Sequence, residues 1–162
     1  MYSDRYDSPL GPLLLTCTDQ GLTGIYMNRE SLAQYHDHPF LRQTADWLDA
    51  YFRGENREIP IPLAPEGTAF QQMVWELLLQ IPYGESCTYG NLARMIAQRL
   101  GKEKMSAQAV GQAVGRNPIS ILIPCHRVVG AGGKLTGYAG GLHRKIWLLR
   151  HEGQQGIIGL EK

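Results

Sequence analysis

The chain has 162 residues, of which 43% are hydrophobic and 19% charged, and its formal net charge is +1. This composition excludes wholesale disorder and allows an ordinary hydrophobic core. No apolar run approaches the roughly 20 residues that a membrane-spanning helix needs. Residues 1–7 are polar and lack the apolar centre of a signal peptide. Three cysteines without CxxC spacing argue against a disulfide framework, so we expect a cytoplasmic protein with no membrane partner.

The charge is divided unevenly along the chain. Residues 1–80 hold 11 acidic and 5 basic side chains, whereas residues 81–162 hold 4 and 11. A basic second half favours contact with an anionic partner. Chance segregation of solvated surface charge gives the same numbers, so the charge pattern alone leaves both interpretations open.

The first third of the chain has the pattern of a small α/β domain. Two apolar runs, 11–18 and 22–27, flank a turn signal and predict a β-hairpin. Residues 38–52 then carry apolar side chains at helical spacing, up to a stop at Gly54. The run 59–63 contains two prolines and is predicted as an edge strand, because proline is not tolerated in a central one.

A domain boundary is predicted at the proline-rich stretch 59–67, where the charge balance also changes. This gives an N-terminal domain of residues 1–67 and a C-terminal domain of residues 68–162. The second domain opens with a predicted helix, because Thr68 is a good N-cap and Gln71 stands at the capping-box spacing. An apolar helical face follows these two residues.

Two short helices follow in tandem, in the pattern of a helix-turn-helix. Thr88 can cap a helix over 89–100, and Ser106 can cap a second helix over 107–115. The second helix is built almost wholly of Ala, Gly, Val and Gln, so it has little bulk on any face. Small residues allow tight packing between helices, and they equally allow close approach to a narrow groove. Both interpretations stay open.

The residues with candidate chemistry lie in the last third of the chain. The β-branched run 119–123 predicts a buried strand that leads into Cys125 and His126, ahead of a glycine-rich loop, 130–141, and a final helix, 142–150. A cysteine in this place can be a catalytic group or a small core residue. Adjacent residues of an extended segment point to opposite sides, so a direct cysteine–histidine dyad needs a water or a local turn. No four-ligand zinc spacing is present, and we predict no metal.

The run Pro124–Val129, preceded by Asn117–Ile123, resembles the active-site signature of the O6-alkylguanine-DNA alkyltransferases, or methylated-DNA–protein-cysteine methyltransferases. Further motifs stand in the family's order: Phe70-x3-Val74-Trp75, Ile81-Pro82-x-Gly84, Thr88-Tyr89, Gly137–Leu142 and Trp147–Gly153. The resemblance is dense over residues 68–153 and weak over residues 1–67.

The resemblance implies both a fold and a reaction. The fold would be a ribonuclease-H-like α/β domain followed by a mainly α domain with a helix-turn-helix of the winged-helix type. The partner would be double-stranded DNA with an alkylated guanine, which is flipped out through the minor groove. The protein, a monomer without a cofactor, would transfer the alkyl group of O6-alkylguanine, and also of O4-alkylthymine, to Cys125. The transfer would be irreversible, so that each molecule acts once.

Five residues match the catalytic positions of the family. The resemblance implies that Glu152 orients His126, which takes the proton of Cys125 through a bound water. This water answers the difficulty that the cysteine and the histidine are adjacent. Tyr89 matches a tyrosine that serves the leaving guanine or the rotated phosphate. Asn117 matches the residue that ties the helix-turn-helix to the active-site strand.

The resemblance also implies binding residues. Tyr138, Ala139 and Gly140 match the loop that caps the flipped base and offers it backbone N–H groups. Val128 would offer its backbone carbonyl to the base. The positions implied on the DNA side are Gln108, Ala107, Tyr89, Arg94, Gly111 and Arg116.

Gln108 departs from the best-known family pattern. Many members carry an arginine at this position of the recognition helix, where it fills the gap left by the flipped base. Glutamine can insert and hydrogen-bond but adds no charge, so we expect repair with weaker DNA binding. The zinc site of some relatives is not expected here, because Cys17 has no partner cysteine in the N-terminal half.

Three alternative functions share part of this pattern. Damage-recognition relatives bind alkylated guanine but lack the cysteine, whereas Cys125 is present here. A transcription regulator with the same helix-turn-helix usually brings a further methyl-accepting domain, for which 162 residues leave no room. A cysteine hydrolase would turn over a small ester or peptide repeatedly. The sequence therefore favours a single-use DNA repair transferase.

Overall fold

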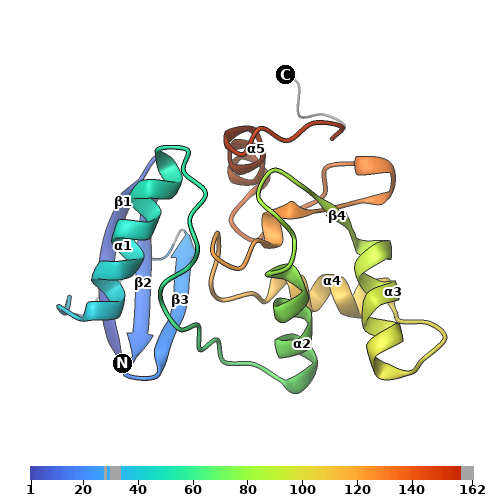
Figure 1. The fold of residues 1–162 in the computed structure, drawn as a ribbon, viewed down its shortest axis with the longest axis horizontal. Helices are drawn as coiled ribbons and strands as arrows, with labels where there is room; N and C mark the ends of the chain where they lie inside the picture. Colours follow the sequence, from blue (N-terminus) through green and yellow to red (C-terminus); the bar gives the residue numbers. More distant parts are fainter. Residues whose placement is uncertain (28, 30–33, 158–162) are drawn as a thin grey trace. The chain divides into compact units, whose positions relative to one another are not determined.

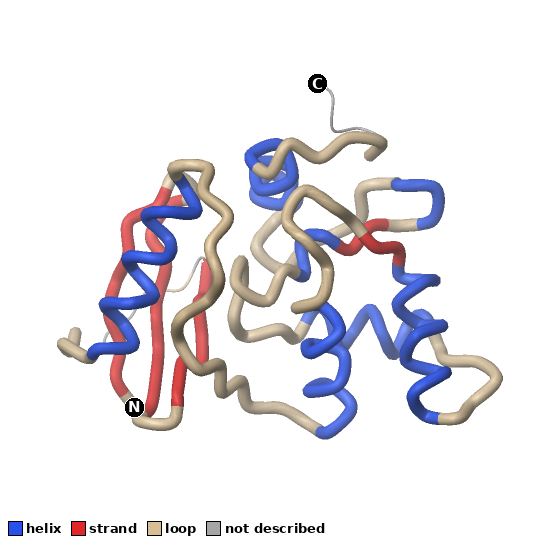
Figure 2. Tube along the Cα trace, viewed as in Figure 1, coloured by secondary structure: helices blue, strands red, loops and turns tan. Residues whose placement is uncertain are grey.

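The computed structural model describes residues 1–27, 29 and 34–157, and the chain forms two compact units (Figure 1). Unit 1 comprises Met1–Glu66 and Pro118–Leu122, and unit 2 comprises Gly67–Asn117 and Ile123–Lys162. Unit 1 holds a small sheet with one helix, and unit 2 is mainly helical (Figure 2). Among the described residues, no helix combines the length and apolarity needed to cross a membrane.

The segment Pro118–Leu122 is placed differently from the prediction, which assigned it to the second domain. In strand β3 (Gly21–Met27), Ile25 donates its N–H to the Pro118 carbonyl (2.9 Å). Its carbonyl accepts the N–H of Ser120 (3.3 Å). This pairing makes the segment part of unit 1, although the residues on both sides of it belong to unit 2.

The sheet of unit 1 is antiparallel, in the order β1 (Tyr2–Ser8), β2 (Gly11–Thr18) and β3. The predicted hairpin is confirmed, and Leu15 of β2 lies opposite Ile25 of β3. Because alternate residues of a strand share a face, one face of β2 is buried, through Leu13, Leu15 and Cys17.

Helix α1 (Pro39–Phe52) contacts all three strands and covers the sheet of unit 1 (Figure 1). The helix predicted over residues 38–52 is therefore confirmed. His38 is the N-cap, and its Nδ1 accepts the N–H of Phe40 (3.1 Å). Leu41 and Leu48 are buried on the inner face. Burial of each such side chain contributes about 1.5–3 kcal/mol, which holds the helix on the sheet.

The edge strand predicted over residues 59–63 is wrong except at one residue. Leu63 forms a single parallel bridge to Leu22. The N–H of Leu22 is bonded to the Pro62 carbonyl, and its carbonyl accepts the N–H of Ala64 (both 2.8 Å). Proline has no N–H, so the pairing does not extend into a ladder.

The buried strand predicted over residues 119–123 is also wrong, although the segment is buried. Within this segment only Ile119 pairs with a strand, through its bridge to Ile25, and the chain then turns. Ile121 has φ +75°, a left-handed conformation that β-branched residues rarely adopt. The apolar composition predicts burial correctly, but it carries no signal for this turn.

Unit 2 contains the helices that the sequence predicts: α2 (Ala69–Leu78), α3 (Tyr89–Leu100), α4 (Ala107–Gly115) and α5 (Leu142–His151). In the first three, the predicted N-cap hydroxyl accepts a backbone N–H of the first turn, at Thr68, Thr88 and Ser106. Gln71 completes the capping box of α2. Gly101 ends α3 in the left-handed conformation (φ +67°).

Helices α3 and α4 form the helix-turn-helix, and both contact α2. Trp75 of α2 donates its indole N–H to the Ala113 carbonyl of α4 (2.9 Å). Helix α4 buries Val110 and Val114 and exposes Gln108. Its small residues therefore serve tight packing on one face and leave little bulk on the exposed face.

A two-stranded parallel sheet in unit 2 was not predicted. Strand β4 (Cys87–Thr88) pairs with β5 (Val128–Val129), and two residues are too few to produce a strand pattern in the sequence. Tyr89 follows β4 directly, and β5 follows the turn that contains Cys125. The sheet thus joins the start of the helix-turn-helix to the segment of the candidate nucleophile.

Candidate active site

Cys125 begins a single 3₁₀ turn, η1 (Cys125–Arg127), instead of continuing an extended strand. Its N–H is bonded to the Ile123 carbonyl (2.8 Å), and the residue is 7% exposed. The extended geometry assumed for Cys125 and His126 is therefore wrong. In a 3₁₀ turn, successive side chains diverge by about 120° rather than about 180°, so the turn supplies the change of direction that a cysteine–histidine arrangement needs.

His126 and Glu152 form a buried pair. Nε2 of the imidazole lies 2.7 Å from Oε2 of the carboxylate, and neither side chain is exposed. Glu152 is the C-cap of α5, where its N–H is bonded to the Leu148 carbonyl (3.0 Å). The two residues are 26 positions apart, and the structure brings them together as the resemblance implies.

Arg127 is a third member of this group, and sequence reasoning missed it. Its Nε donates to Oε1 of Glu152 (2.8 Å), and its Nη2 donates to Oε2 (3.1 Å). Nη1 donates to the Ile81 carbonyl (2.7 Å), and the guanidinium carbon lies 5.7 Å from the centre of the Tyr83 ring. The available signal was its place inside the quoted Pro124–Val129 motif.

Lys145 is a second buried cation that sequence reasoning missed. Its Nζ donates to the Val128 carbonyl (2.6 Å) and to Oγ1 of Thr136 (3.1 Å), and the residue is 1% exposed. It stands three and four positions before two buried leucines of α5, Leu148 and Leu149. A lysine on the apolar face of a helix was therefore the signal that could have found it. The Val128 carbonyl, which the resemblance implies faces the flipped base, already accepts a hydrogen bond from this ammonium.

The charges around Glu152 keep it ionised and leave His126 neutral. Burial by itself would raise the pKa of Glu152, but hydrogen bonds and charges of His126 and Arg127 outweigh it and lower that pKa. Burial lowers the pKa of His126 below its usual 6.5. Glu152 opposes this shift, whereas the charges of Arg127 and Lys145 add to it. At neutral pH the pair is a carboxylate and an uncharged imidazole.

The cysteine and the lysine are coupled electrostatically. Burial raises the pKa of Cys125, while hydrogen bonds from Asn117 and Tyr138 and the charge of Lys145 oppose this rise. Burial lowers the pKa of Lys145 to about 8, and the charge of Cys125 opposes that shift. Each group therefore stabilises the charged form of the other.

Asn117 and Tyr89 both lie beside Cys125. Nδ2 of Asn117 donates to the Ile123 carbonyl (2.8 Å), which fixes the chain two residues before the cysteine. Tyr89 is half-buried at the start of α3. Burial raises its pKa, a hydrogen bond with Thr136 lowers it, and the charge of Cys125 raises it. Tyr89 therefore keeps its proton at neutral pH.

The expected base-capping residues form a turn before α5. The N–H of Gly141 is bonded to the Tyr138 carbonyl (2.9 Å), and Arg144 of α5 donates to the Gly140 carbonyl (2.7 Å). Ala139 is exposed and Gly140 is buried. Since the Tyr138 side chain also acts on Cys125, this turn lies next to the cysteine.

The expected DNA-contacting residues lie on or beside α3 and α4. Ala107 and Gln108 are exposed in the first turn of α4, and Arg116 is exposed at its C-cap. Arg94 is exposed on α3. Gly111 faces the tyrosine that opens α3, because an added Cβ would lie 3.9 Å from that ring. The expected contacts are thus distributed over one helix-turn-helix.

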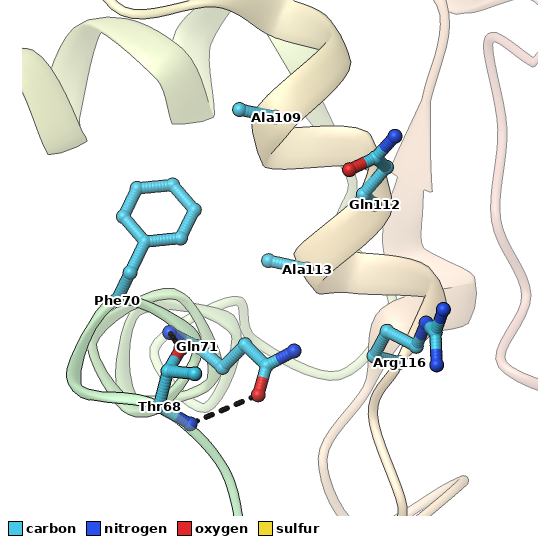
Figure 3. A pocket seen from close by; sticks show the side chains of 7 residues that line it. All are labelled: Thr68, Phe70, Gln71, Ala109, Gln112, Ala113 and Arg116. Atoms are coloured by element: carbon cyan, nitrogen blue, oxygen red, sulfur yellow. Dashed lines mark hydrogen bonds between the residues drawn. The ribbon is translucent and has the colours of Figure 1, made fainter.

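A groove of about 280 Å³ lies between the first turn of α2 and helix α4 (Figure 3). Ala109 and Ala113 face it from α4, with Gln112 and Arg116 beside them (Figure 3). The seven lining residues, all of them described, include no acidic side chain: Thr68, Phe70, Gln71, Ala109, Gln112, Ala113 and Arg116. Sequence reasoning named only Arg116 of these as a DNA contact.

Both units match models of one protein family. Residues 1–65 match the model described as 6-O-methylguanine DNA methyltransferase, ribonuclease-like domain. Residues 69–154 match the model described as 6-O-methylguanine DNA methyltransferase, DNA binding domain. The two matches leave only a short linker and the last residues outside.

Individual relatives are similar over almost the whole chain. The methylated-DNA–protein-cysteine methyltransferase of Methanosarcina acetivorans is 46% identical over 159 residues, which cover 94% of this chain and 99% of that protein. The protein of the same name from Mycobacterium leprae is 43% identical, with 95% and 93% covered. The crystal structure of Mycobacterium tuberculosis OGT in complex with DNA has a TM-score of 0.82 at 45% identity, with 94% and 92% covered.

The fold and the site define a DNA-binding protein that uses a cysteine as its nucleophile. A buried histidine–carboxylate pair, as formed here by His126 and Glu152, is an arrangement that can activate such a nucleophile. The chain belongs to the methylated-DNA–protein-cysteine methyltransferase family. Its activity is the repair of DNA by direct reversal, in which an alkyl group is transferred to a cysteine.

Proposed function

We propose that Cys125 is the acceptor and that the substrate is O6-alkylguanine, and also O4-alkylthymine, in double-stranded DNA. The Cys125 sulfur attacks the alkyl carbon, a C–S bond forms, and the bond from that carbon to the base oxygen breaks. The base oxygen becomes a carbonyl, and the proton lost by the thiol ends on the base. The thioether is not reversed, so each molecule reacts once. The observation that carries this proposal is that the buried Cys125 is accompanied by a buried histidine, His126, and a buried lysine, Lys145.

His126 takes the proton of Cys125. Its Nε2 faces the Glu152 carboxylate, so that nitrogen carries the imidazole proton and Nδ1 has the lone pair. Nδ1 is buried and bonds to no described protein atom, and a water between it and the sulfur can relay the proton. Glu152 then stabilises the imidazolium that forms.

Lys145 stabilises the thiolate. Displacement at an alkyl carbon needs a thiolate, which is a minor species for an ordinary thiol at neutral pH and rarer for a buried one. The ammonium of Lys145 and the hydrogen bonds of Asn117 and Tyr138 offset this effect of burial. Loss of the thiol proton therefore creates an ion pair rather than an isolated buried charge.

The leaving base is received by Tyr89 and by the loop before α5. Tyr89 retains its proton because of its raised pKa, so it can donate a hydrogen bond or the proton to the base. The backbone of Tyr138–Gly140 offers N–H groups to the base edge. The Val128 carbonyl has two lone pairs, so it can accept an amino group of the base beside the ammonium of Lys145.

We infer that α4 enters the minor groove and that Gln108 fills the space left by the flipped base. A base inside a duplex cannot reach a sulfur in a residue that is 7% exposed, so it must rotate out. Ala107 and Gly111 allow the helix to approach closely. Arg94 and Arg116 are exposed on the same helix-turn-helix, where they supply phosphate contacts.

We further propose that unit 1 is ribonuclease-H-like and that the helix-turn-helix is of the winged-helix type. The ribonuclease-like description of the family model supports the first point, and the short sheet of β4 and β5 beside the two helices supports the second. We propose a cytoplasmic location, because the three cysteines are free thiols, typical of a reducing compartment, and we propose that the protein acts as a monomer. The transfer balances without a cofactor or a metal, and we propose neither.

The amount of lesion repaired per protein molecule tests this function. A fixed quantity of protein is mixed with increasing amounts of duplex that contains one O6-methylguanine, and the repaired guanine is counted after completion. We expect a plateau at one lesion per molecule, no repair by Cys125→Ser, and normal repair by Cys87→Ala. Continued turnover would support a hydrolase, and binding without repair would support a damage-recognition protein.

A further inference from the structure

Arg127 binds the carboxylate of Glu152, the group proposed to orient His126. Its Nε and Nη2 take one oxygen each, Oε1 at 2.8 Å and Oε2 at 3.1 Å. Oε2 is also the oxygen that faces Nε2 of His126 at 2.7 Å. One carboxylate oxygen of Glu152 is therefore shared between an imidazole and a guanidinium. The side chains of His126 and Glu152 are both fully buried.

Sharing this oxygen weakens the pull of the carboxylate on the imidazole. Part of the negative charge of Glu152 is neutralised by the guanidinium, so less of it stabilises a protonated His126. The charged groups that act on His126 are Glu152, Arg127 and Lys145, and Cys125 precedes it in the chain. Two of these are cations, and of the two only Arg127 also binds the oxygen of Glu152 that His126 uses.

Arg127 is itself fixed by a segment far away in the sequence. Nη1 donates to the Ile81 carbonyl (2.7 Å), in the turn that follows α2, and the Tyr83 ring lies against the guanidinium. The planar fork thus has three fixed hydrogen bonds. A lysine has no such fork and cannot reproduce the two parallel bonds to the carboxylate.

We propose that Arg127 is a positioning residue that keeps His126 uncharged at physiological pH by sharing the Glu152 carboxylate. Arg127 thereby sets the lower end of the pH range in which alkyl transfer is fast. This inference rests on the proposed function for the role of His126, but the charge state of the imidazole can be measured without any transfer.

The first test is the titration of His126 itself. Histidine-labelled protein is followed by NMR over pH, with the His126 signal assigned by its loss in His126→Asn. For Arg127→Met we expect the midpoint to rise by about one pH unit or more, as for removal of a neighbouring like charge. Arg127→Lys should give a smaller rise. Arg150→Met, which removes an exposed cation near the end of α5, should give none.

The second test is the pH profile of single-turnover methyl transfer from O6-methylguanine duplex. We expect the acid limb of Arg127→Met to move upward by the same amount, with the rate recovering at high pH. A uniform loss of rate at every pH, with an unchanged His126 midpoint, would make Arg127 merely structural and overturn the proposal. If the Met variant does not fold, the Lys variant decides between the same two outcomes. If the wild type transfers no methyl group, the proposed function fails while the titration still reports on Arg127.

Discussion

The two units bury different kinds of polar side chain. Among the described residues of unit 1, the buried polar side chains all carry hydroxyls: Ser3, Thr16, Thr23 and Thr44. In unit 2 they are charged, titratable or amide side chains: His126, Arg127, Lys145, Glu152 and Gln154. The hydroxyls are satisfied close by, as in the pair of Thr16 and Thr23 (2.8 Å). The charged groups instead lie around His126, the residue that follows Cys125.

This difference distinguishes unit 1 from the unit that contains the proposed reactive site. A buried neutral hydroxyl with a hydrogen-bond partner has little effect on stability, whereas a buried charge costs several kcal/mol that pairing only offsets. In the proposed function, unit 2 keeps its charges in spite of this cost because they control the proton of Cys125. The described residues of unit 1 bury no such charges, and unit 1 includes the segment Pro118–Leu122, which in the sequence separates the two segments of unit 2.

Glu152→Gln should have the largest effect, because it removes the charge that joins His126 to Arg127. The amide keeps the shape of the side chain but cannot stabilise an imidazolium. We expect single-turnover transfer to slow by about 100-fold or more, the usual contribution of a positioned acid–base group. Glu85→Gln, at an exposed position before β4, is the matched control. An unchanged rate would exclude the histidine–carboxylate pair from the reaction.

The same substitution should change the pH dependence of stability. Folding lowers the pKa of Glu152 from its ordinary 4.5, so near and below that pH the unfolded chain binds more protons than the native chain. The carboxylate therefore stabilises the fold above pH 4.5, and this contribution is lost as the pH falls. Urea unfolding should show Glu152→Gln less stable by about 3–5 kcal/mol at neutral pH. A difference that does not narrow in acid would contradict this linkage.

Lys145→Met separates function from stability within unit 2. The thiolate loses a neighbouring ammonium, and one unit of thiol pKa changes the thiolate fraction tenfold, so transfer should slow by about tenfold or more. The free energy of unfolding should change by less than about 2 kcal/mol, because an apolar side chain replaces a buried charge. Both quantities are measured on the same preparation. A large loss of stability with an unchanged rate would make Lys145 structural.

Gln108→Arg should strengthen DNA binding several-fold without changing the chemistry of the buried site. If the added charge contacts one phosphate, the slope of log affinity against log salt should steepen by about 0.9. Gln98→Arg, an equally exposed change on α3, is the control for net charge. Unchanged or weaker binding would show that this position does not insert into the duplex.

The double change Thr16→Val and Thr23→Val should have the smallest effect. Both partners of a buried hydroxyl pair are removed together, so no polar atom is left without a partner. We expect the free energy of unfolding to change by less than about 1 kcal/mol and the transfer rate to stay the same. A large loss of activity would give unit 1 a direct part in the reaction and end its contrast with unit 2.

The elements that the sequence predicts correctly depend on short-range signals. The caps at Thr68, Thr88 and Ser106 act within three residues, so the sequence contains the whole interaction. The strand prediction for residues 119–123 failed because their backbone conformation depends on pairing with Ile25, far away in the chain, and on the left-handed Ile121. Distant pairing is not visible in local composition.

The sequence supplied candidate site residues where a family motif names them, and it missed residues whose contacts depend on the fold. Cys125 and His126 were candidates from their place between an apolar run and a glycine-rich loop, and the resemblance added Glu152. The structure places His126 and Glu152 in contact. Arg127 contacts Glu152 and Lys145 contacts the Val128 carbonyl, and these residues come together only in the folded chain. A lysine at helical spacing from apolar residues is the sequence signal that should have drawn attention to Lys145.

In the proposed reaction, one alkyl group is transferred to Cys125 and stays there. Intact-protein mass measured after mixing with excess duplex that carries O6-methylguanine tests it most directly, with Cys125→Ala as the control. We expect a gain of one methyl group on the wild type, no further gain with time, and none on the variant. A wild-type protein that binds the lesion but gains no mass, or a variant that still gains a methyl group, would contradict it.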